Sequence, residues 1–254
     1  MTIAGSDSGG GAGIQADLKA FAAAGCHGMS VLVALTAQNT LGVTAVHELP
    51  PEFVRAQLEA VYDDIGVDAA KTGMLFSAPI IETVADFLEG RETALVVDPV
   101  MVASSGAKLL LDDAVDVLVR RLFPLATIVT PNLLEAETLT GRPGAPRREL
   151  AERLHELEAA AVIVTGGHGD DAVDHFYDGV EHYEFPVPRH EVPATHGAGC
   201  THSATVAALL AKGERPVRVT RAAGKVASDA VKNGLTEIGA GEGPVDVFHL
   251  AGVR

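Results

Sequence analysis

The sequence predicts an α/β fold in which helices cover both faces of a central, mostly parallel β-sheet. Short β-branched runs alternate with helix-like segments along the 254 residues, and no internal repeat interrupts this alternation. Strands that alternate with helices are typical of a parallel sheet. A composition with 47% hydrophobic and 21% charged residues is that of a globular protein. We therefore predict one domain over residues 1–254.

The elements follow from local patterns. Buried strands are predicted at four apolar runs, Val31–Thr36, Leu95–Val97, Thr127–Thr130 and Val162–Thr165. Helices are predicted where apolar residues recur at helical spacing, after Pro50-Pro51 (Val54, Leu58, Val61, Ile65) and around Leu150, Leu154 and Leu157. Arg142–Arg148 (RPGAPRR) is predicted to be a loop, and His175–Pro188 a hairpin with Asp178-Gly179 as its turn.

The net charge and the number of cysteines limit the partners and the compartment that we expect for this protein. A formal net charge of −15 argues against nucleic acid as a partner. The acidic surplus fits either adaptation to high salt or ordinary solubility. The apolar runs are too short to span a membrane, and the first residues do not resemble a signal peptide. Two cysteines, Cys26 and Cys200, do not make a disulfide framework, so we expect a cytoplasmic protein.

A glycine turn at Thr195–Ser203 (THGAGCTHS) runs directly into an alanine-rich helical pattern. Gly197 and Gly199 allow the backbone to approach a ligand, and the first N–H groups of a helix are unsatisfied, so a phosphate suits this position. The alternative is a tight strand–helix turn without a ligand. Cys200 lies at the predicted helix start, where the dipole is expected to lower its pKa. Alternatively, it is a small hydrophobic residue.

Acidic residues follow two predicted strands. Asp98 ends a buried strand in VVDPVM and is expected to face solvent in a cleft. Asn132 and Glu135 follow the next apolar run. Two carboxylates at neighbouring strand ends can hold Mg²⁺ through water beside nucleotide phosphates. The alternative for Asn132 and Glu135 is a helix cap.

The segment Gly5–Asp17 (GSDSGGGAGIQAD) is rich in glycine but matches neither the dinucleotide-binding fingerprint nor a Walker A loop. We expect a loop after the first strand that admits a flat substrate against the backbone. Asp17 would orient a substrate hydroxyl group, or alternatively act as a capping acid of the following helix.

Six segments, in this order, resemble the hydroxymethylpyrimidine and phosphomethylpyrimidine kinases of thiamine biosynthesis, which belong to the ribokinase-like superfamily: GSDSGGGAGIQADLK, TAQNTLGV, AAKTGML, VVDPVM, TPNLLEAE and THGAGCTHSA. The resemblance implies a ribokinase-like fold and a homodimer. It also implies that ATP and Mg²⁺ are used to phosphorylate 4-amino-5-hydroxymethyl-2-methylpyrimidine, and then to convert the monophosphate to the diphosphate.

The resemblance also implies roles for individual residues. It assigns Gly197, Ala198, Gly199 and Cys200 to an anion hole, with Cys200 where related sugar kinases carry a catalytic Asp. It assigns Asp98 and Glu135 to the magnesium ion, and Gly5, Asp17, Gln38 and Met74 to the pyrimidine pocket.

One position departs from the family pattern, because Thr165 stands where a Lys is common. A pyridoxal kinase and a catalytically silent ligand-binding regulator are the two alternatives to this function. Gln38-Asn39 favours the pyrimidine, since the Gln amide can both donate and accept hydrogen bonds. The joint presence of Asp98, Glu135 and Cys200 favours an enzyme over a regulator.

Overall fold

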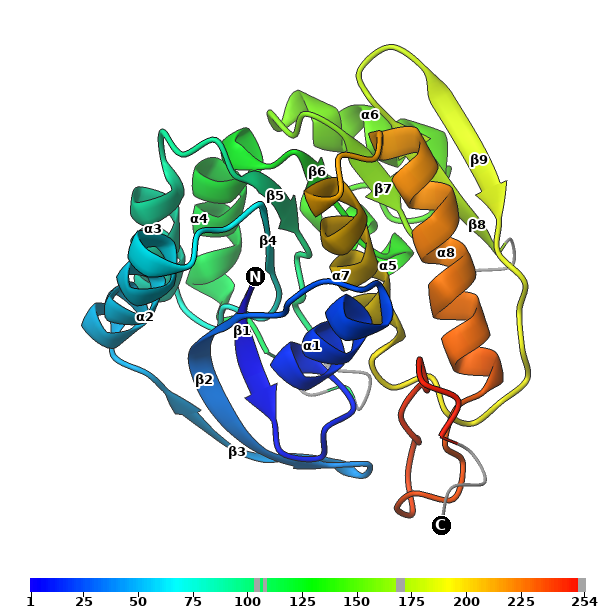
Figure 1. The fold of residues 1–254 in the computed structure, drawn as a ribbon. Coiled ribbons are helices and arrows are strands. Elements are labelled where there is room, and N and C mark those ends of the chain that lie inside the picture. Colours follow the sequence, from blue (N-terminus) through cyan, green and yellow to red (C-terminus); the bar gives the residue numbers. More distant parts are fainter. Residues whose placement is uncertain (103–105, 107–108, 168–171, 251–254) are drawn as a thin grey trace.

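The computed structural model describes residues 1–102, 106, 109–167 and 172–250. Within this part of the chain, nine strands form one sheet with the order β3-β2-β1-β4-β5-β6-β7-β8-β9 (Figure 1). The strands are β1 (Thr2–Asp7), β2 (Ser30–Asn39), β3 (Gly42–Glu48), β4 (Ala69–Thr72), β5 (Ala94–Val97), β6 (Ile128–Val129), β7 (Val162–Val164), β8 (Val173–Tyr177) and β9 (His182–Pro186).

The centre of the sheet is parallel. Strands β2, β1, β4, β5, β6 and β7 pair in parallel, whereas β3 at one edge and β8 and β9 at the other pair antiparallel. The predicted mostly parallel sheet is confirmed. Because parallel strands end at the same edge of a sheet, the residues that follow β1, β4, β5, β6 and β7 lie along one line.

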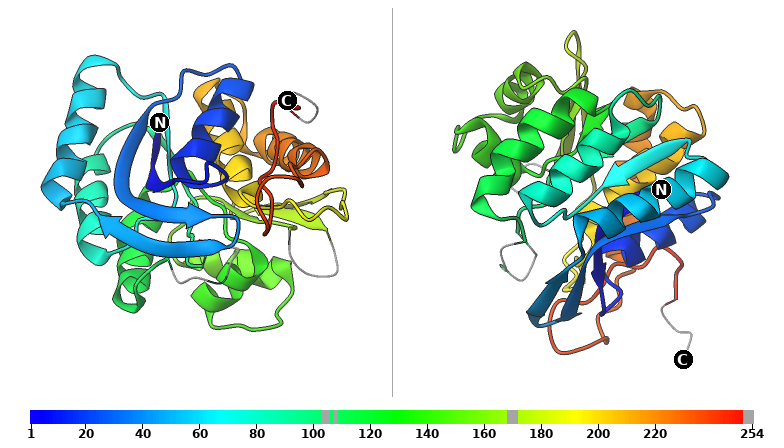
Figure 2. Two further views of the ribbon diagram at one scale, coloured as in Figure 1. Left: turned by 90° about the horizontal axis from the view of Figure 1, so that it is seen from below. Right: turned by 90° about the vertical axis from the view of Figure 1, so that its left-hand side faces the viewer.

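Helices cover both faces of the sheet. They are α1 (Gly13–Ala23), α2 (Pro51–Asp64), α3 (Ala78–Leu88), α4 (Asp112–Leu122), the 3₁₀ helix η1 (Phe123–Leu125), α5 (Leu133–Thr140), α6 (Arg147–Glu156), α7 (Ala198–Ala211) and α8 (Pro216–Lys232). Helices α1, α7 and α8 pack together on one face. Helices α2, α3 and α4 lie side by side on the other face, as the right view of Figure 2 shows, and α5 and α6 continue this layer.

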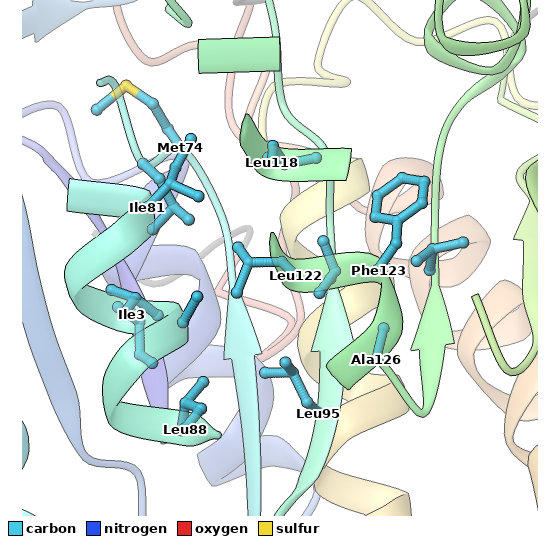
Figure 3. Close-up of a cluster of buried hydrophobic side chains, with 14 of the residues drawn as sticks. Ile3, Met74, Ile81, Leu88, Leu95, Leu118, Leu122, Phe123 and Ala126 are labelled. Carbon is cyan, nitrogen blue, oxygen red and sulfur yellow. The ribbon is translucent and has the colours of Figure 1, made fainter. Parts of the chain in front are cut away.

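The larger hydrophobic core lies between the sheet and the α2–α6 layer (Figure 3). Ile3 and Leu95 from the strands meet Ile81 of α3 and Leu122 of α4, and each of these side chains is at most 2% exposed. Full burial of one such side chain contributes about 1.5–3 kcal/mol to stability. A second cluster, which includes Phe176, lies under α1, α7 and α8. These two cores fix the strands, and therefore the positions of their carboxyl ends.

Local predictions are confirmed with changes at their ends. Pro51 begins α2, but Ile65 lies beyond its last residue and is exposed. The predicted loop at Arg142–Arg148 is shorter than expected, because α6 begins at Arg147. Within the described residues, no helix is long and apolar enough to cross a membrane.

The two-residue turn predicted for the hairpin is wrong. Strands β8 and β9 do pair, but four residues connect them. The side chain of Asp178 accepts hydrogen bonds from the backbone N–H groups of Val180 and Glu181, at 3.1 and 2.8 Å. An Asp that bonds the backbone ahead of it stabilises a longer turn than Asp-Gly alone specifies.

Candidate active site

A pocket of about 1200 Å³ extends along the edge where the parallel strands end. Gly5, Gln38 and Met74 lie at one end of its lining, and Thr165 and Val187 belong to the stretch that follows β7 and β9. Ligands of open α/β sheets bind at this edge, outside the carboxyl ends of the strands. A second, smaller pocket beside Gln38 is bounded by residues 39–41, 241 and 242.

The N-terminus of α7 forms the middle of the pocket. Gly197, Ala198, Gly199 and Cys200 all line it, and their role as an anion hole stays a prediction. Gly197 has φ 86°, which favours glycine, and a Cβ atom at this position would overlap the carbonyl oxygen of Gly11. A Cβ atom at Gly199 would have no neighbour within 4 Å, because it would project into open space. The backbone therefore presents the first N–H groups of a helix to the pocket.

Lys71 is a buried cation in the pocket wall, and sequence reasoning assigned it no role. Its Nζ atom lies 3.0 Å from both carboxylate oxygens of Asp17 and 3.8 Å from Oδ2 of Asp98. Burial alone would lower the pKa of this amine, but the charges of Asp17 and Asp98 raise it above its ordinary value. Lys71 is therefore charged at neutral pH, and it brings a positive charge to the centre of the pocket.

Asp17 occupies a different position from the one predicted. Its side chain is fully buried on the inner face of α1, accepts a hydrogen bond from Thr2 Oγ1 at 2.6 Å and pairs with Lys71. It does not belong to the pocket lining. The expected contact with a substrate hydroxyl is corrected accordingly, because the packing of α1 on the sheet turns this carboxylate inward. In the structure, Asp17 positions Lys71.

Asp98 lines the pocket, but it does not face solvent as predicted. It is 6% exposed, because α7 covers the end of β5. Ser203 of that helix donates a hydrogen bond to its Oδ2 atom at 2.7 Å. Asp98 is therefore a buried carboxylate that contacts the pocket between Lys71 and Ser203.

Glu135 lies beside Asp98 in the pocket wall and also caps a helix. Asn132 Oδ1 accepts from the Glu135 backbone N–H at 3.0 Å, and Glu135 Oε2 accepts from the Asn132 N–H at 2.9 Å. The capping alternative is thus confirmed. Burial, followed by the charge of Asp98, raises the pKa of Glu135 to about 8. A cation shared with Asp98 would remove the repulsion that raises this pKa, so the pair fits Mg²⁺.

Any such metal ion would have few protein ligands. Among the described residues, no group of three or more His, Cys, Asp and Glu side chains is arranged to hold a metal ion. Magnesium keeps several waters and takes one or two carboxylates together with substrate phosphates in many nucleotide sites. Two carboxylates therefore suffice for a magnesium ion that arrives with a nucleotide.

The predicted lowering of the pKa of Cys200 is wrong. Burial raises the pKa of this thiol to about 12, and Asp17 and Asp98 add to the effect, while Lys71 and the Gly13 N–H oppose it. Burial and two carboxylates therefore act against the thiolate that a helix N-terminus favours, even though the residue as a whole is only partly buried. Cys200 is a protonated thiol at neutral pH.

The end of the pocket lined by Gly5 and Met74 is built from two strands and a loop. Gly5 lies inside β1, not in the loop that the glycine-rich sequence predicted. A Cβ atom at Gly5 would overlap Cε of Met74, so glycine allows this side chain to lie across β1. Gln38 at the end of β2 accepts a hydrogen bond from Thr36 Oγ1 at 3.1 Å, and its Nε2 lies 3.4 Å from Nε2 of His196. Gly5, Met74 and Gln38 line the pocket, and their contact with a pyrimidine stays a prediction.

Asp7 and His196 are two further residues of this end, to which sequence reasoning assigned no individual role. Asp7 Oδ2 lies 3.0 Å from His196 Nε2 and accepts from the N–H groups of Gly11 and Ala12 at 3.0 and 2.8 Å. Burial opposes ionisation, but His196 and the backbone donors outweigh it and hold the pKa of Asp7 below its usual range. Asp7 thus orders the glycine-rich segment and holds His196 beside Gly197.

Comparisons with known proteins agree with this geometry. Residues 7–246 match the phosphomethylpyrimidine kinase family. The chain belongs to this family. A hydroxymethylpyrimidine/phosphomethylpyrimidine kinase of Rhizobium meliloti is 48% identical over 98% of this chain and 96% of its own length. The thiamine biosynthesis bifunctional protein ThiED of Geobacter sulfurreducens is 51% identical over 97% of this chain. The chain spans about half the length of that protein, 51%.

A solved structure has the same fold as this chain. The ADP complex of Bacillus subtilis pyridoxal kinase superposes with a TM-score of 0.89 at 39% identity, and the match covers 98% of this chain and 97% of that one. The ribokinase-like fold is therefore confirmed. Thr165, where the family pattern led us to expect Lys, lines the pocket after β7, and its N–H donates to the Pro131 carbonyl.

Proposed function

We propose that this kinase uses ATP and Mg²⁺ to phosphorylate the hydroxymethyl group of 4-amino-5-hydroxymethyl-2-methylpyrimidine. The same site then converts the monophosphate to the diphosphate, and both products serve thiamine biosynthesis. The observation that carries the proposal is one continuous pocket with a helix N-terminus at its middle. The part of the pocket at Gln38 suits a small flat substrate, and the part at Thr165 suits a nucleotide.

The transfer depends on positioning and on charge. Phosphoryl transfer asks little covalent chemistry of a protein, and charge stabilisation provides most of the catalysis. The N–H groups from Gly197 to Cys200 would hold the migrating phosphoryl group, and the buried Lys71 would offset its negative charge. Asp98 and Glu135 would hold Mg²⁺, which neutralises charge on the phosphate oxygens.

Cys200 fits an anion-hole role better than a role as general base. A thiol whose pKa is raised to about 12 keeps its proton at neutral pH and cannot accept another from the substrate alcohol. Its small side chain and its backbone N–H still shape the helix N-terminus. General-base assistance by Cys200 would require the bound substrate to lower this pKa by several units, since a base acts best when its pKa lies near the working pH.

Magnesium binding should release a proton from Glu135. With a pKa of about 8, this carboxyl group is mostly protonated at pH 7, whereas a metal ligand must be ionised. We expect Mg–ADP binding at pH 7 to release close to one proton. Titration calorimetry in two buffers of different ionisation enthalpy measures this number. Glu135→Gln should abolish the release, and Glu137→Gln, in the same helix, should preserve it. Identical proton release in both variants would contradict the assignment.

The same group makes stability depend on pH in the absence of metal. The folded chain binds the Glu135 proton more tightly than the unfolded chain does, because the pKa rises from its ordinary value of 4.5 to about 8. The stability that this group contributes is therefore complete below pH 4.5 and is lost as the pH rises through about 8. In urea unfolding experiments, Glu135→Gln should flatten this part of the pH dependence relative to Glu137→Gln.

Gln38 should determine the choice of substrate. Its amide can donate to the ring nitrogen and accept from the exocyclic amine of the pyrimidine, a pair of groups that pyridoxal lacks. An unpaired buried amide costs about 1–3 kcal/mol. Gln38→Met should therefore lower kcat/KM for hydroxymethylpyrimidine by about 10–100-fold. The loss with pyridoxal should be smaller, and a coupled ADP-release assay measures both substrates.

The structural similarity to a pyridoxal kinase makes vitamin B6 phosphorylation the second candidate function. The test is the same assay on the wild-type chain. Faster turnover of pyridoxal than of hydroxymethylpyrimidine would overturn the substrate assignment and leave the kinase assignment intact. Absence of turnover with hydroxymethylpyrimidine, its monophosphate and pyridoxal would instead favour a silent ligand-binding regulator.

We also propose that the chain is a single kinase domain that acts as a cytoplasmic homodimer on small molecules, without a nucleic-acid or membrane partner. The net charge of −15 supports the last point, because such a surface repels polyanions. Exposed Leu35 and Leu41 on the β2–β3 hairpin offer apolar surface for association. Light scattering coupled to gel filtration measures the oligomeric state.

A further inference from the structure

A cluster of two histidines lies outside the active-site pocket, on the side of the β8–β9 hairpin that faces α6. Nε2 of His175 in β8 and Nδ1 of His182 in β9 are 2.9 Å apart. Neither residue lines the pocket described above. Their side chains are only 2% and 11% exposed, so both imidazole rings are enclosed.

A carboxylate lies behind each of these rings. Nδ1 of His175 is 3.3 Å from Glu184 Oε1, and Nε2 of His182 is 3.2 Å from Glu152 Oε1. A carboxylate accepts a hydrogen from the ring nitrogen that it faces. When each neutral ring carries its proton on the nitrogen that faces a carboxylate, both inner nitrogens present lone pairs to each other, whereas with the proton on one inner nitrogen the two rings share a hydrogen bond. Two lone pairs at 2.9 Å repel unless an electrophile, either an additional proton or a metal ion, lies between them.

The surroundings hold the rings in this orientation. Tyr177 stacks on His182 with ring centroids 4.1 Å apart and an angle of 12° between the planes. His175 pairs with Glu184 directly across the two strands. Burial, followed by the neighbouring His182, lowers the pKa of His175.

The other charged and titratable groups around the cluster come from α6. Arg148 lowers the pKa of His175. The Nε atom of Arg148 lies 3.3 Å from Oε1 of Glu152, and this same oxygen faces Nε2 of His182. His155 packs edge-on against Tyr177, and its Nδ1–H donates a hydrogen bond to the carbonyl oxygen of Ala159 at 2.7 Å. Glu152 therefore balances the positive charge of Arg148, and the carboxylate of Glu184 gives the cluster a net negative charge.

We propose that His175 and His182 bind a divalent transition metal ion of the Zn²⁺ class, which takes the place of the shared proton between their inner nitrogens. Glu184 and Glu152 act behind the ligands by fixing the tautomer and orientation of each ring. Metal-binding histidines in proteins are commonly backed by carboxylates in this way. Imidazole nitrogen suits Zn²⁺, Ni²⁺ and Cu²⁺, whereas Mg²⁺ prefers oxygen. This site and the proposed magnesium site would therefore not compete for the same ion.

The geometry requires only a small adjustment. Two nitrogens that each lie about 2.0–2.1 Å from a tetrahedral Zn²⁺ are about 3.3 Å apart. The rings would have to separate by a few tenths of an ångström from their distance of 2.9 Å. Since the chain supplies two ligands, water that enters beside the exposed Glu152 and Glu184 side chains would have to complete the coordination. The bound ion would join the two strands of the hairpin, whose continuation carries Val187 into the active-site pocket.

The first experiment is calorimetric titration of the purified chain with Zn²⁺ at pH 7.5, without nucleotide or Mg²⁺. We expect the wild type to bind one ion at a site that the double variant His175→Gln/His182→Gln lacks. The matched control is His27→Gln/His47→Gln, which removes two exposed histidines elsewhere and should bind as the wild type does. Zn²⁺ bound by Cys200 or other groups would persist in both variants. Equal binding by both double variants would overturn the proposal.

A second set of variants does not touch the buried rings. Glu152 and Glu184 are 45% and 69% exposed, so Glu152→Gln and Glu184→Gln should fold normally. Loss of a carboxylate behind a ligand typically weakens metal binding about 10–100-fold, and we expect this result. Glu156→Gln at the end of α6 is the control and should change nothing. Unchanged Zn²⁺ affinity in both carboxylate variants, or displacement of Zn²⁺ by excess Mg²⁺, would contradict the proposal.

Discussion

Replacement of Lys71 by Met should abolish kinase activity and lower the free energy of unfolding by about 3–5 kcal/mol, the usual cost of breaking a buried ion pair. The reason is the surroundings of this amine, which is fully buried between Asp17 and Asp98. Without the cation, two carboxylates remain enclosed without a counter-charge. The active site also loses the positive charge that we assign to the migrating phosphoryl group.

A second variant separates the two effects. In Lys71→Met/Asp17→Asn both partners of the pair are neutral, so most of the lost stability should return, because replacement of a whole buried pair is often close to neutral. Activity should stay lost if the charge acts on the phosphoryl group. Urea unfolding measures the stability and ADP release measures the activity. Recovery of both in the double variant would limit Lys71 to a structural role.

The matched control is the exposed pair of Lys225 and Asp229 in α8. Lys225→Met removes the same kind of side chain from a surface ion pair, and such pairs contribute about 0–1 kcal/mol. We therefore expect little change in stability and none in activity. Wild-type turnover in Lys71→Met would contradict our assignment of this residue, whatever the control shows.

The sheet and the position of the site could be predicted from the sequence because both depend on local patterns. The β-branched runs gave the buried strands, and the polar residues that follow them, such as Asp98 and Asn132, mark the carboxyl edge. The Thr195–Ser203 turn had a local signal too, since it joins glycines to a helical pattern. The family resemblance supplied the chemistry that these patterns alone leave open.

Lys71 and Asp17 could not be paired from local patterns, because they lie 54 residues apart and meet only through packing. The sequence did, however, contain part of the information needed to place Asp17. Ile14, Asp17 and Phe21 recur at helical spacing, and all three are buried in α1. A helix assigned to this segment would have placed Asp17 on its inner face, where a carboxylate needs a cation. The Lys in the buried strand segment AAKT was the available partner.

The pKa of Cys200 could not be predicted for a similar reason. The sequence shows a helix N-terminus, which favours a thiolate, but burial and the charges of Asp17 and Asp98 depend on the tertiary structure. The prediction of the hairpin turn was wrong for a more local reason. The Asp-Gly signal was read as a complete turn, whereas the Asp178 side chain organises the two residues that follow Gly179.

Replacement of Gly197 by Ala should cause the second large loss. Gly197 has φ 86°, and an L-residue in this region costs about 1–2 kcal/mol. The added methyl group would also overlap the Gly11 carbonyl, so the backbone at the start of α7 must move. A displacement of about 1 Å in a positioning group can cost about 100-fold in rate. We expect kcat/KM to fall by at least this factor, and stability to fall with it.

Gly199→Ala tests the same helix start without disturbing the fold. A methyl group at Gly199 has no protein neighbour within 4 Å, and alanine favours the helix over glycine by about 1 kcal/mol, so stability should stay equal or rise. The methyl group would, however, occupy the space in which we place the phosphoryl group. We therefore expect a stable protein whose KM for ATP rises and whose kcat/KM falls about 10-fold or more, a loss of about 1.4 kcal/mol in transition-state binding. Urea unfolding and ADP release measured on both glycine variants give the comparison. Wild-type kinetics in Gly199→Ala would mean that no phosphate approaches this turn, and the anion hole would have to be sought elsewhere along the pocket.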